Sequence, residues 1–191
     1  MSDEAYCYPP DYTVLRNRFD LRSQSDLDFY ESYFVGLRLS GIMPTGNFDL
    51  RHLKAIHRHL FQDVYDWAGE LRTVEISKGG SQFQFRRFIE TGMADVHRRL
   101  VDKKFLRKLG PEEFAREAGP LIGDVNYVHP FREGNGRAQM VYLRQLAEQV
   151  GHALDLTRID RDAWMAASRE AHLGRYEAMG NCIAMAVAAA R

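Results

Sequence analysis

The apolar residues of this chain recur mostly at the three- and four-residue spacing of an amphipathic helix. The first such run starts near Ser25, which together with Asp28 resembles a capping box. Its predicted buried face consists of Leu27, Tyr30, Phe34 and Leu37. Further helices are predicted at residues 50–64, 86–109, 111–128, 137–150 and 160–173, with a last one in the alanine-rich tail. The Gly119–Pro120 pair should kink or split the helix at 111–128.

The period changes from helical to alternating between residues 73 and 85. The alternating apolar positions are Val74, Ile76, Phe83 and Phe85, and the turn between them is Lys78-Gly79-Gly80-Ser81. Two short alternating runs around a Gly–Gly turn predict a β-hairpin. Because this hairpin is all the strand that the pattern indicates, the predicted fold class is all-α.

The chain has 191 residues, with 26 basic and 26 acidic side chains and therefore a formal net charge of zero. Its length predicts one domain over residues 1–191, with an extended lead-in at 1–10 and a helical tail at about 175–191. The charge balance gives no general attraction to nucleic acid or to an anionic membrane. The longest apolar run, at 182–190, is too short to span a bilayer. Two cysteines outside any C-x-x-C pair, and a start without a signal-peptide pattern, favour a cytoplasmic protein.

One segment between two strongly apolar predicted helices carries candidate chemistry: His129-Pro130-Phe131-Arg132-Glu133-Gly134-Asn135-Gly136-Arg137. The two glycines around Asn135 let backbone amides turn inward, and the helix N-terminus that follows favours phosphate. Arg137, in the first turn of that helix, suits a bound polyanion. Glu133 offers one hard oxygen ligand to magnesium, and His129 is suited to accept a proton near neutral pH. The segment therefore suggests a phosphate site, with Phe131 as an apolar plug that anchors the loop.

The residues alone also allow plainer interpretations. A Gly-Asn-Gly loop between two helices is commonly only a turn. His52, His57 and His59 share one predicted helix, but no two of them have i,i+4 spacing and no carboxylate completes a set of ligands. We therefore expect these histidines to lie on a solvated or half-buried face rather than to bind a metal.

The segment at 129–137 matches nine positions of the signature of the Fic family, H-x-F-x-[D/E]-G-N-G-R-x-x-R. The stretch Tyr-Asp-Trp-Ala-Gly-Glu-Leu-Arg at 65–72, followed by Ile-Ser-Lys-Gly-Gly at 76–80, also resembles the family's segment leading into its flap. The resemblance runs from about residue 11 to about residue 171. It implies a helical core with the motif in a loop between two central helices, and a hairpin flap above that loop.

Most Fic proteins transfer AMP from ATP to a hydroxyl of a target protein, so the resemblance implies ATP as substrate and Mg²⁺ as cofactor. It implies that His129 deprotonates the target hydroxyl and that Glu133 holds magnesium. The residues implied to bind the phosphates are Gly134, Asn135, Gly136 and Arg137. The residues implied to dock the target by strand pairing are Val74, Ile76, Lys78, Gly79 and Gly80.

The chain departs from the signature at its last position, where Met140 replaces a second arginine. In the family this arginine holds the terminal phosphate of ATP. Its replacement leaves several alternatives open: slower AMP transfer, a different nucleotide donor, a phosphotransferase, or a catalytically silent protein-binding module. A plain packing role for Met140 is a further alternative.

The chain also lacks the family's inhibitory motif, [S/T]-x-x-x-E-[G/N]. Glu133 alone among the glutamates precedes a glycine, and His129 occupies the position that requires serine or threonine. By resemblance, small Fic proteins of this kind are toxins held by a separate antitoxin that supplies an inhibitory helix. The family suggests subunits of DNA gyrase or topoisomerase IV as targets.

Overall fold

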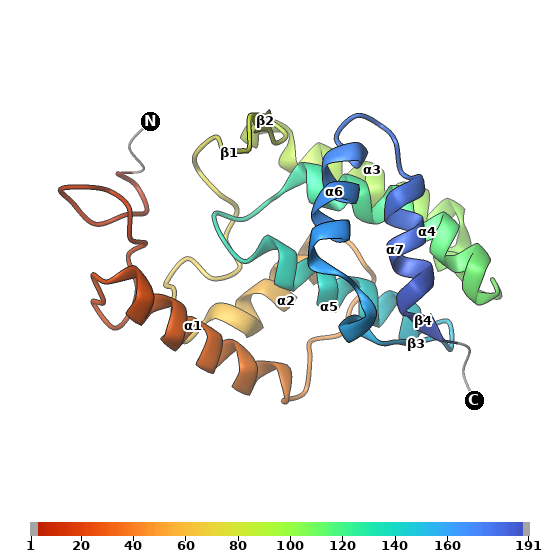
Figure 1. The fold of residues 1–191 in the computed structure, drawn as a ribbon, viewed down its shortest axis with the longest axis horizontal. Helices are drawn as coiled ribbons and strands as arrows, with labels where there is room; N and C mark the ends of the chain where they lie inside the picture. The colour runs from red at the N-terminus through yellow and green to blue at the C-terminus, as the bar shows by residue number, and fades with distance from the viewer. Residues whose placement is uncertain (1–3, 189–191) are drawn as a thin grey trace.

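The structure is a computed structural model that describes residues 4–188 of the chain, and this part is mostly helical (Figure 1). The α-helices are α1 (Gln24–Leu39), α2 (Leu50–Phe61), α3 (Ile89–Asp102), α4 (Pro111–Val128), α5 (Asn135–Glu148), α6 (Arg161–Ala171) and α7 (Glu177–Ala186). Short 3₁₀ turns occur at Arg86–Phe88, Lys104–Leu106 and Leu156–Arg158. The predicted all-α class is confirmed. Within residues 4–188, every helix is too short or too polar to cross a membrane.

Strand structure is limited to two short antiparallel ladders in the described residues. β1 (Ser77–Lys78) pairs with β2 (Ser81–Gln82) around the predicted Gly–Gly turn. The alternating pattern at 73–85 predicted a longer hairpin, but outside this ladder the strands keep one cross-strand bond, from the Phe83 N–H to the Ile76 carbonyl at 3.2 Å. A second ladder, which the sequence pattern did not predict, joins β3 (Ala153–Leu154) to β4 (Val187–Ala188).

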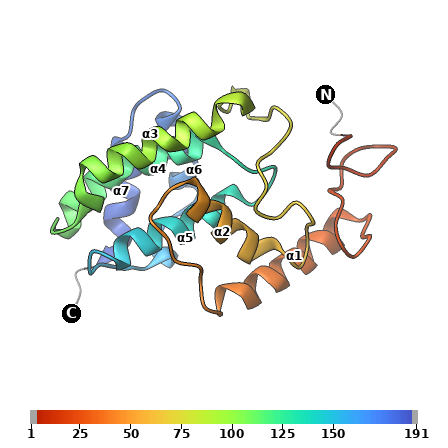
Figure 2. The same cartoon turned by 180° about the vertical axis from the view of Figure 1, so that it is seen from behind.

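Helix α4 lies at the centre of the fold, in contact with α3, α5, α6 and α7 (Figure 2). On the other side, α5 contacts α2, and α2 in turn contacts α1. Of the kink or split predicted at Gly119–Pro120, the split is wrong, because α4 runs through Pro120 as one helix. A Cβ atom at Gly119 would lie 2.9 Å from the backbone nitrogen of Gly180 in α7. This close packing of two helices offsets the hydrogen bond that the proline removes.

Helix α1 differs from its prediction in both its start and its buried face. Its N-cap is Ser23, whose hydroxyl accepts from the Asp26 N–H, and Ser25 lies inside the helix. The buried residues of α1 are Leu27, Glu31 and Val35. Tyr30 and Leu37, predicted to be buried, are 40% and 52% exposed. The pattern failed here because it treats a glutamate as a surface residue, and Glu31 is a buried one.

Two other helix boundaries also differ from their predictions. The helix predicted at 86–109 ends at Asp102, because Lys104, Phe105 and Leu106 have left-handed φ angles of 52°, 55° and 57°. Helix α5 starts at Asn135, so Asn135 and Gly136 belong to its first turn rather than to the loop. The predicted lead-in and helical tail each extend beyond the described residues, which include α7 and β4 from the tail.

Candidate active site

The motif segment forms a tight loop between α4 and α5. His129 caps the C-terminus of α4 with a left-handed backbone (φ 47°), and Gly134, the N-cap of α5, has φ 79°. The Asn135 side chain closes the loop: its Oδ1 accepts from the Phe131 N–H at 2.9 Å, and its Nδ2 donates to the Phe131 carbonyl at 2.8 Å. Asn135 is buried, so its amide braces the loop instead of facing a ligand. The role of Asn135 toward phosphate stays a prediction.

The backbone around Gly134 presents an anion-binding helix end. A Cβ atom at Gly134 would lie 2.4 Å from the Phe61 ring, so both the φ angle and the close contact require glycine there. Helix α5 has no side-chain cap, which leaves the amides of its first turn available to a negatively charged ligand. Gly136 is exposed in this turn. The geometry therefore fits phosphate at the start of α5.

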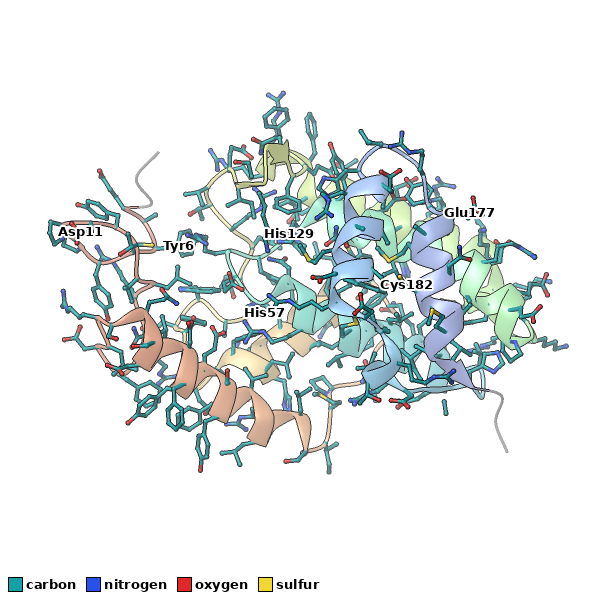
Figure 3. All side chains as sticks on the ribbon, viewed as in Figure 1. Tyr6, Asp11, His57, His129, Glu177 and Cys182 are labelled. Atoms are coloured by element: carbon teal, nitrogen blue, oxygen red, sulfur yellow. The ribbon has the colours of Figure 1, made fainter. Side chains whose placement is uncertain are left out.

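His129, labelled in Figure 3, has one ring nitrogen bonded within the protein. Its Nδ1 lies 3.0 Å from the Asn126 carbonyl oxygen, which can only accept, so Nδ1 carries the proton and Nε2 keeps its lone pair. Its ring stacks on Phe83 with centroids 3.7 Å apart. Burial lowers the pKa of His129 to about 4. The imidazole is therefore neutral at physiological pH, the state that a general base requires.

Arg72 connects the flap to the catalytic loop and is a residue that motif analysis did not single out. Its side chain is fully buried, and its Nε donates to the His129 carbonyl at 2.8 Å. Its guanidinium also donates to the carbonyls of Val74 and Gln84, which lie on either side of the hairpin. The clue in the sequence was the position of Arg72 at the end of the 65–72 stretch.

His57 supports the same loop from α2, and its burial corrects the expected solvated or half-buried face. It is fully buried, and its Nδ1 accepts from the Gly69 N–H at 2.9 Å. Its Nε2 donates to the Glu133 carbonyl at 2.9 Å, and its ring stacks on Phe131 with centroids 3.9 Å apart. Burial lowers the pKa of His57 to about 4. His57 is thus a neutral strut under the loop.

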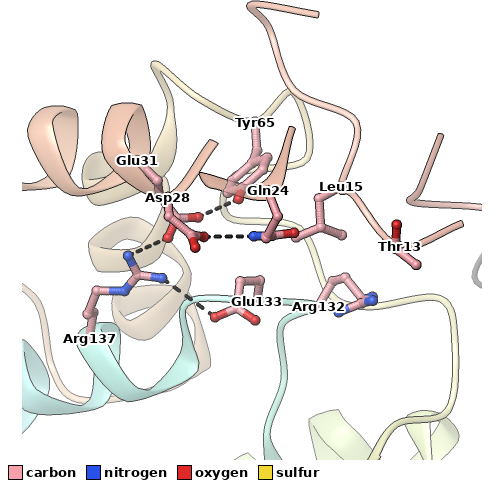
Figure 4. Close-up of a pocket in the computed structure, with 9 residues that line it drawn as sticks. All are labelled: Thr13, Leu15, Gln24, Asp28, Glu31, Tyr65, Arg132, Glu133 and Arg137. Atoms are coloured by element: carbon pink, nitrogen blue, oxygen red, sulfur yellow. Dashed lines mark hydrogen bonds and ion pairs between the residues drawn. The ribbon is translucent and has the colours of Figure 1, made fainter. Parts of the chain in front are cut away.

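A cavity of about 370 Å³ lies between α1 and the motif loop (Figure 4). Its lining includes Glu133 and Arg137 from the loop and α5, and Glu31 from α1. The Glu133 carboxylate accepts from the Gly134 N–H at 2.9 Å and its side chain is 48% exposed. The residues that the structure describes contain no group of three or more side chains suited to hold a metal ion. A single exposed carboxylate fits magnesium that takes its other ligands from phosphate and water.

The remaining predicted residues fall into two groups. Met140 is partly buried, packs against the core and does not line the cavity. In the flap, Lys78, Gly79 and Gly80 are exposed, while Val74 and Ile76 are half-buried. The flap places Phe83, which motif analysis did not assign, directly over the His129 ring.

The uncapped N-terminus of α5, the exposed Glu133 carboxylate and the neutral His129 ring all belong to one short segment, residues 129–137. The chain matches the Fic/DOC family over residues 47–147, which is more than half its length. It therefore belongs to the Fic/DOC family, as its motif predicted.

Curated relatives extend this match over most of the chain. The probable protein adenylyltransferase y4lH of Sinorhizobium fredii is 37% identical over 159 residues, covering 83% of this chain and 82% of the relative. The probable protein adenylyltransferase Fic of Escherichia coli K12 is 32% identical over 180 residues, covering 92% and 88%. The protein adenylyltransferase VbhT of Bartonella schoenbuchensis is 37% identical over 91% of this chain but only 37% of its own length. The predicted enzyme class, a Fic-type protein adenylyltransferase, is confirmed.

Solved structures agree with the fold. The type IV secretion system effector BepA is 29% identical with a TM-score of 0.81, over 94% of this chain and 67% of that one. The BepC protein of Bartonella tribocorum, solved with bound AMPPNP, has a TM-score of 0.88 at 23% identity, over 100% of this chain and 99% of that one.

Proposed function

We propose that this chain, with Mg²⁺ as cofactor, transfers AMP from ATP to a hydroxyl of a target protein. His129 is the general base. The observation that carries the proposal is the Nδ1 contact of His129 with the Asn126 carbonyl, which leaves the Nε2 lone pair of a neutral ring in the segment that leads into the uncapped start of α5. The names of the relatives, probable and established protein adenylyltransferases, support the same reaction.

In this reaction Nε2 of His129 takes the proton of the target hydroxyl, whose oxygen forms a bond to the α-phosphorus of ATP. The bond between the α-phosphorus and the bridging oxygen breaks, and pyrophosphate leaves. The first-turn amide of Gly136 and the Arg137 guanidinium hold the phosphates, and the amide of the N-cap Gly134, which donates to Glu133 in this structure, joins them when the nucleotide is bound. Glu133 would hold magnesium, which supplies charge neutralisation across the phosphates when bound.

Because Met140 replaces the second arginine of the signature, two other functions are tested beside AMP transfer. A phosphotransferase would bind the nucleotide in the reversed orientation and transfer its γ-phosphate to the target. A catalytically silent binding module would transfer no group. Incubating the chain with a candidate target, magnesium and ATP, followed by intact mass spectrometry of the target, distinguishes the three. Added AMP supports the proposal, whereas added phosphate alone, or no adduct with any nucleotide donor, contradicts it.

We further propose that the chain is a cytoplasmic toxin that modifies subunits of DNA gyrase or topoisomerase IV. A separate antitoxin inhibits it. Met140 offers no charge to an antitoxin glutamate, so binding through apolar contacts is expected. Helix α1 supplies such a surface: Phe29, Tyr33 and Leu37 recur at i, i+4 and i+8 and are 69%, 56% and 52% exposed. The whole chain, residues 1–191, acts as a single Fic domain in this proposal.

Growth measurements test the toxin role. Induced expression in a bacterial host should arrest growth with the wild type but not with His129→Ala. Co-expression of the antitoxin should restore growth, and Tyr33→Asp in the toxin should weaken that rescue because it places a charge in the apolar surface. Equal growth with wild type and His129→Ala would contradict a toxic transferase.

A further inference from the structure

Helix α1 contributes a carboxylate to the proposed nucleotide site, although no motif marks it. The Glu31 Oε1 atom lies 2.6 Å from Nη1 of Arg137. The other oxygen of Glu31, Oε2, accepts a hydrogen bond from the Tyr65 hydroxyl. Figure 4 shows the chain of contacts from Tyr65 through Glu31 to Arg137 at one wall of the cavity.

Both oxygens of Glu31 are committed within the protein. Its side chain is only 11% exposed, whereas that of Arg137 is 35% exposed. The Tyr65 ring that donates to Glu31 is itself fixed, because it stacks on Trp67 with centroids 4.3 Å apart. The Glu31 carboxylate is therefore fixed in place, while Arg137 keeps N–H donors that face the cavity.

Arg137 is held by three groups. Glu31 pairs with Nη1, Glu133 lies 3.5 Å from Nη2, and the Phe61 ring lies under the guanidinium at 4.7 Å. Of these, only Glu31 offers a short charge-assisted contact from a buried position. A flexible arginine with a fixed partner loses less freedom when a phosphate binds to its other donors.

We infer that Glu31 is a positioning residue, which holds the Arg137 guanidinium toward the nucleotide phosphates. Because Met140 replaces the second arginine of the signature, the orientation of the remaining one governs phosphate affinity in this chain. The inference rests on the proposed role of Arg137 in nucleotide binding. If Glu31 instead competed with phosphate for Arg137, removing its charge would tighten nucleotide binding rather than weaken it.

The experiment measures the dissociation constant of AMPPNP with magnesium, by isothermal titration, for four forms of the full chain: wild type, Glu31→Gln, Arg137→Gln and the double variant. Glu31→Gln keeps the shape of the side chain and removes its charge. We expect it to weaken AMPPNP binding roughly ten-fold in the wild-type background. In the Arg137→Gln background it should change the affinity less than about two-fold, because the residue through which it acts is gone.

Two further variants separate positioning from general stability. Tyr65→Phe removes only the hydroxyl that fixes Glu31 and should weaken AMPPNP binding in the same direction, by about two- to three-fold. Asp63→Asn is the matched control, because Asp63 pairs with Arg38 of α1 at 2.6 and 2.7 Å and lies outside the cavity. It should leave the affinity for AMPPNP unchanged. Thermal unfolding of each variant verifies that it is folded at the temperature of the titration.

Steady-state transfer assays give a second readout. Glu31→Gln should raise KM for ATP more than it lowers kcat, because positioning of a phosphate-binding group acts on nucleotide binding. Unchanged or tighter AMPPNP binding in Glu31→Gln would overturn the inference, as would an equal loss in both backgrounds. If Arg137→Gln itself left AMPPNP binding unchanged, the proposed role of Arg137 would be wrong instead.

Discussion

His57 and His129 occupy similar surroundings but have different numbers of free ring nitrogens. Both rings stack on a phenylalanine with ring centroids less than 4 Å apart, and burial lowers the pKa of each to about 4. His57 uses both nitrogens inside the protein, one toward Gly69 and one toward Glu133. His129 uses only Nδ1, toward Asn126.

A low pKa does not by itself mark a catalytic histidine. Burial keeps both rings neutral, and a neutral ring with two internal partners can only support structure. A neutral ring with one internal partner has a lone pair to offer a substrate. The unpaired nitrogen, rather than the pKa, distinguishes the proposed base from the strut.

The largest expected effect is on turnover in His129→Ala. Removal of a general base should lower the rate of AMP transfer by about 10³-fold, within the range typical of such groups. Binding of AMPPNP should stay within about two-fold, because the phosphates contact α5 and Arg137. The rate is measured by transfer of labelled AMP to the target.

His59→Gln is a control for this change, since His59 lies on α2, does not line the cavity, and pairs through its Nε2 with the Arg38 carbonyl at 3.0 Å. It should keep the full rate. Transfer by His129→Ala at more than a tenth of the wild-type rate would assign the base to another group.

The second effect is on stability in His57→Ala. The substitution leaves the buried Gly69 N–H and Glu133 carbonyl without partners and opens a cavity beside Phe131. The free energy of unfolding should fall by about 3 kcal/mol. Urea denaturation followed by circular dichroism measures it. A loss below about 1 kcal/mol would show that the loop does not depend on this strut.

The third effect is a dependence of stability on pH. The pKa of each ring is about 4 in the folded chain, against an ordinary value of 6.5. Between these pH values the unfolded chain binds more protons, so the free energy of unfolding falls as the pH is lowered from 6.5 to 4 and is fully restored above 6.5. Each ring contributes on the order of 3 kcal/mol.

Urea denaturation at a series of pH values measures this slope. His57→Ala should flatten it, since the variant lacks one of the two buried rings. An identical slope in the wild type and His57→Ala would mean that His57 does not resist protonation.

The sequence predicted the residues of the motif loop far better than the buried residues that hold this loop in place. The nine matching positions at 129–137 are contiguous, and glycine at 134 follows from local backbone geometry, so a local pattern contains them. Glu31, His57 and Arg72 act through contacts with residues distant in the chain, and each is a polar side chain that burial patterns assign to the surface. The same limit explains the misplaced face of α1. The split predicted at Gly119–Pro120 is absent for a related reason, because the packing of Gly119 on Gly180 of α7 favours a continuous helix over the local preference of proline.

The smallest effect concerns Phe83, which covers the His129 ring and is itself buried. Phe83→Ala opens the ring to water, so the pKa of His129 should rise from about 4 toward its ordinary value of 6.5. The acid limb of kcat/KM for AMP transfer should then move upward by about one pH unit, because it reports the pKa of the free base. At pH 8 the rate should change by less than about three-fold, since the base is neutral in both forms.

Phe85→Ala provides the control, because Phe85 belongs to the same segment but is 52% exposed and is not stacked on His129. Its acid limb should coincide with that of the wild type. An acid limb unchanged in Phe83→Ala would mean that the rest of the loop, including the Arg72 charge beside the ring, sets the pKa of His129. His57 and His129 would then differ only in their hydrogen-bond partners and not in the access of water to the ring.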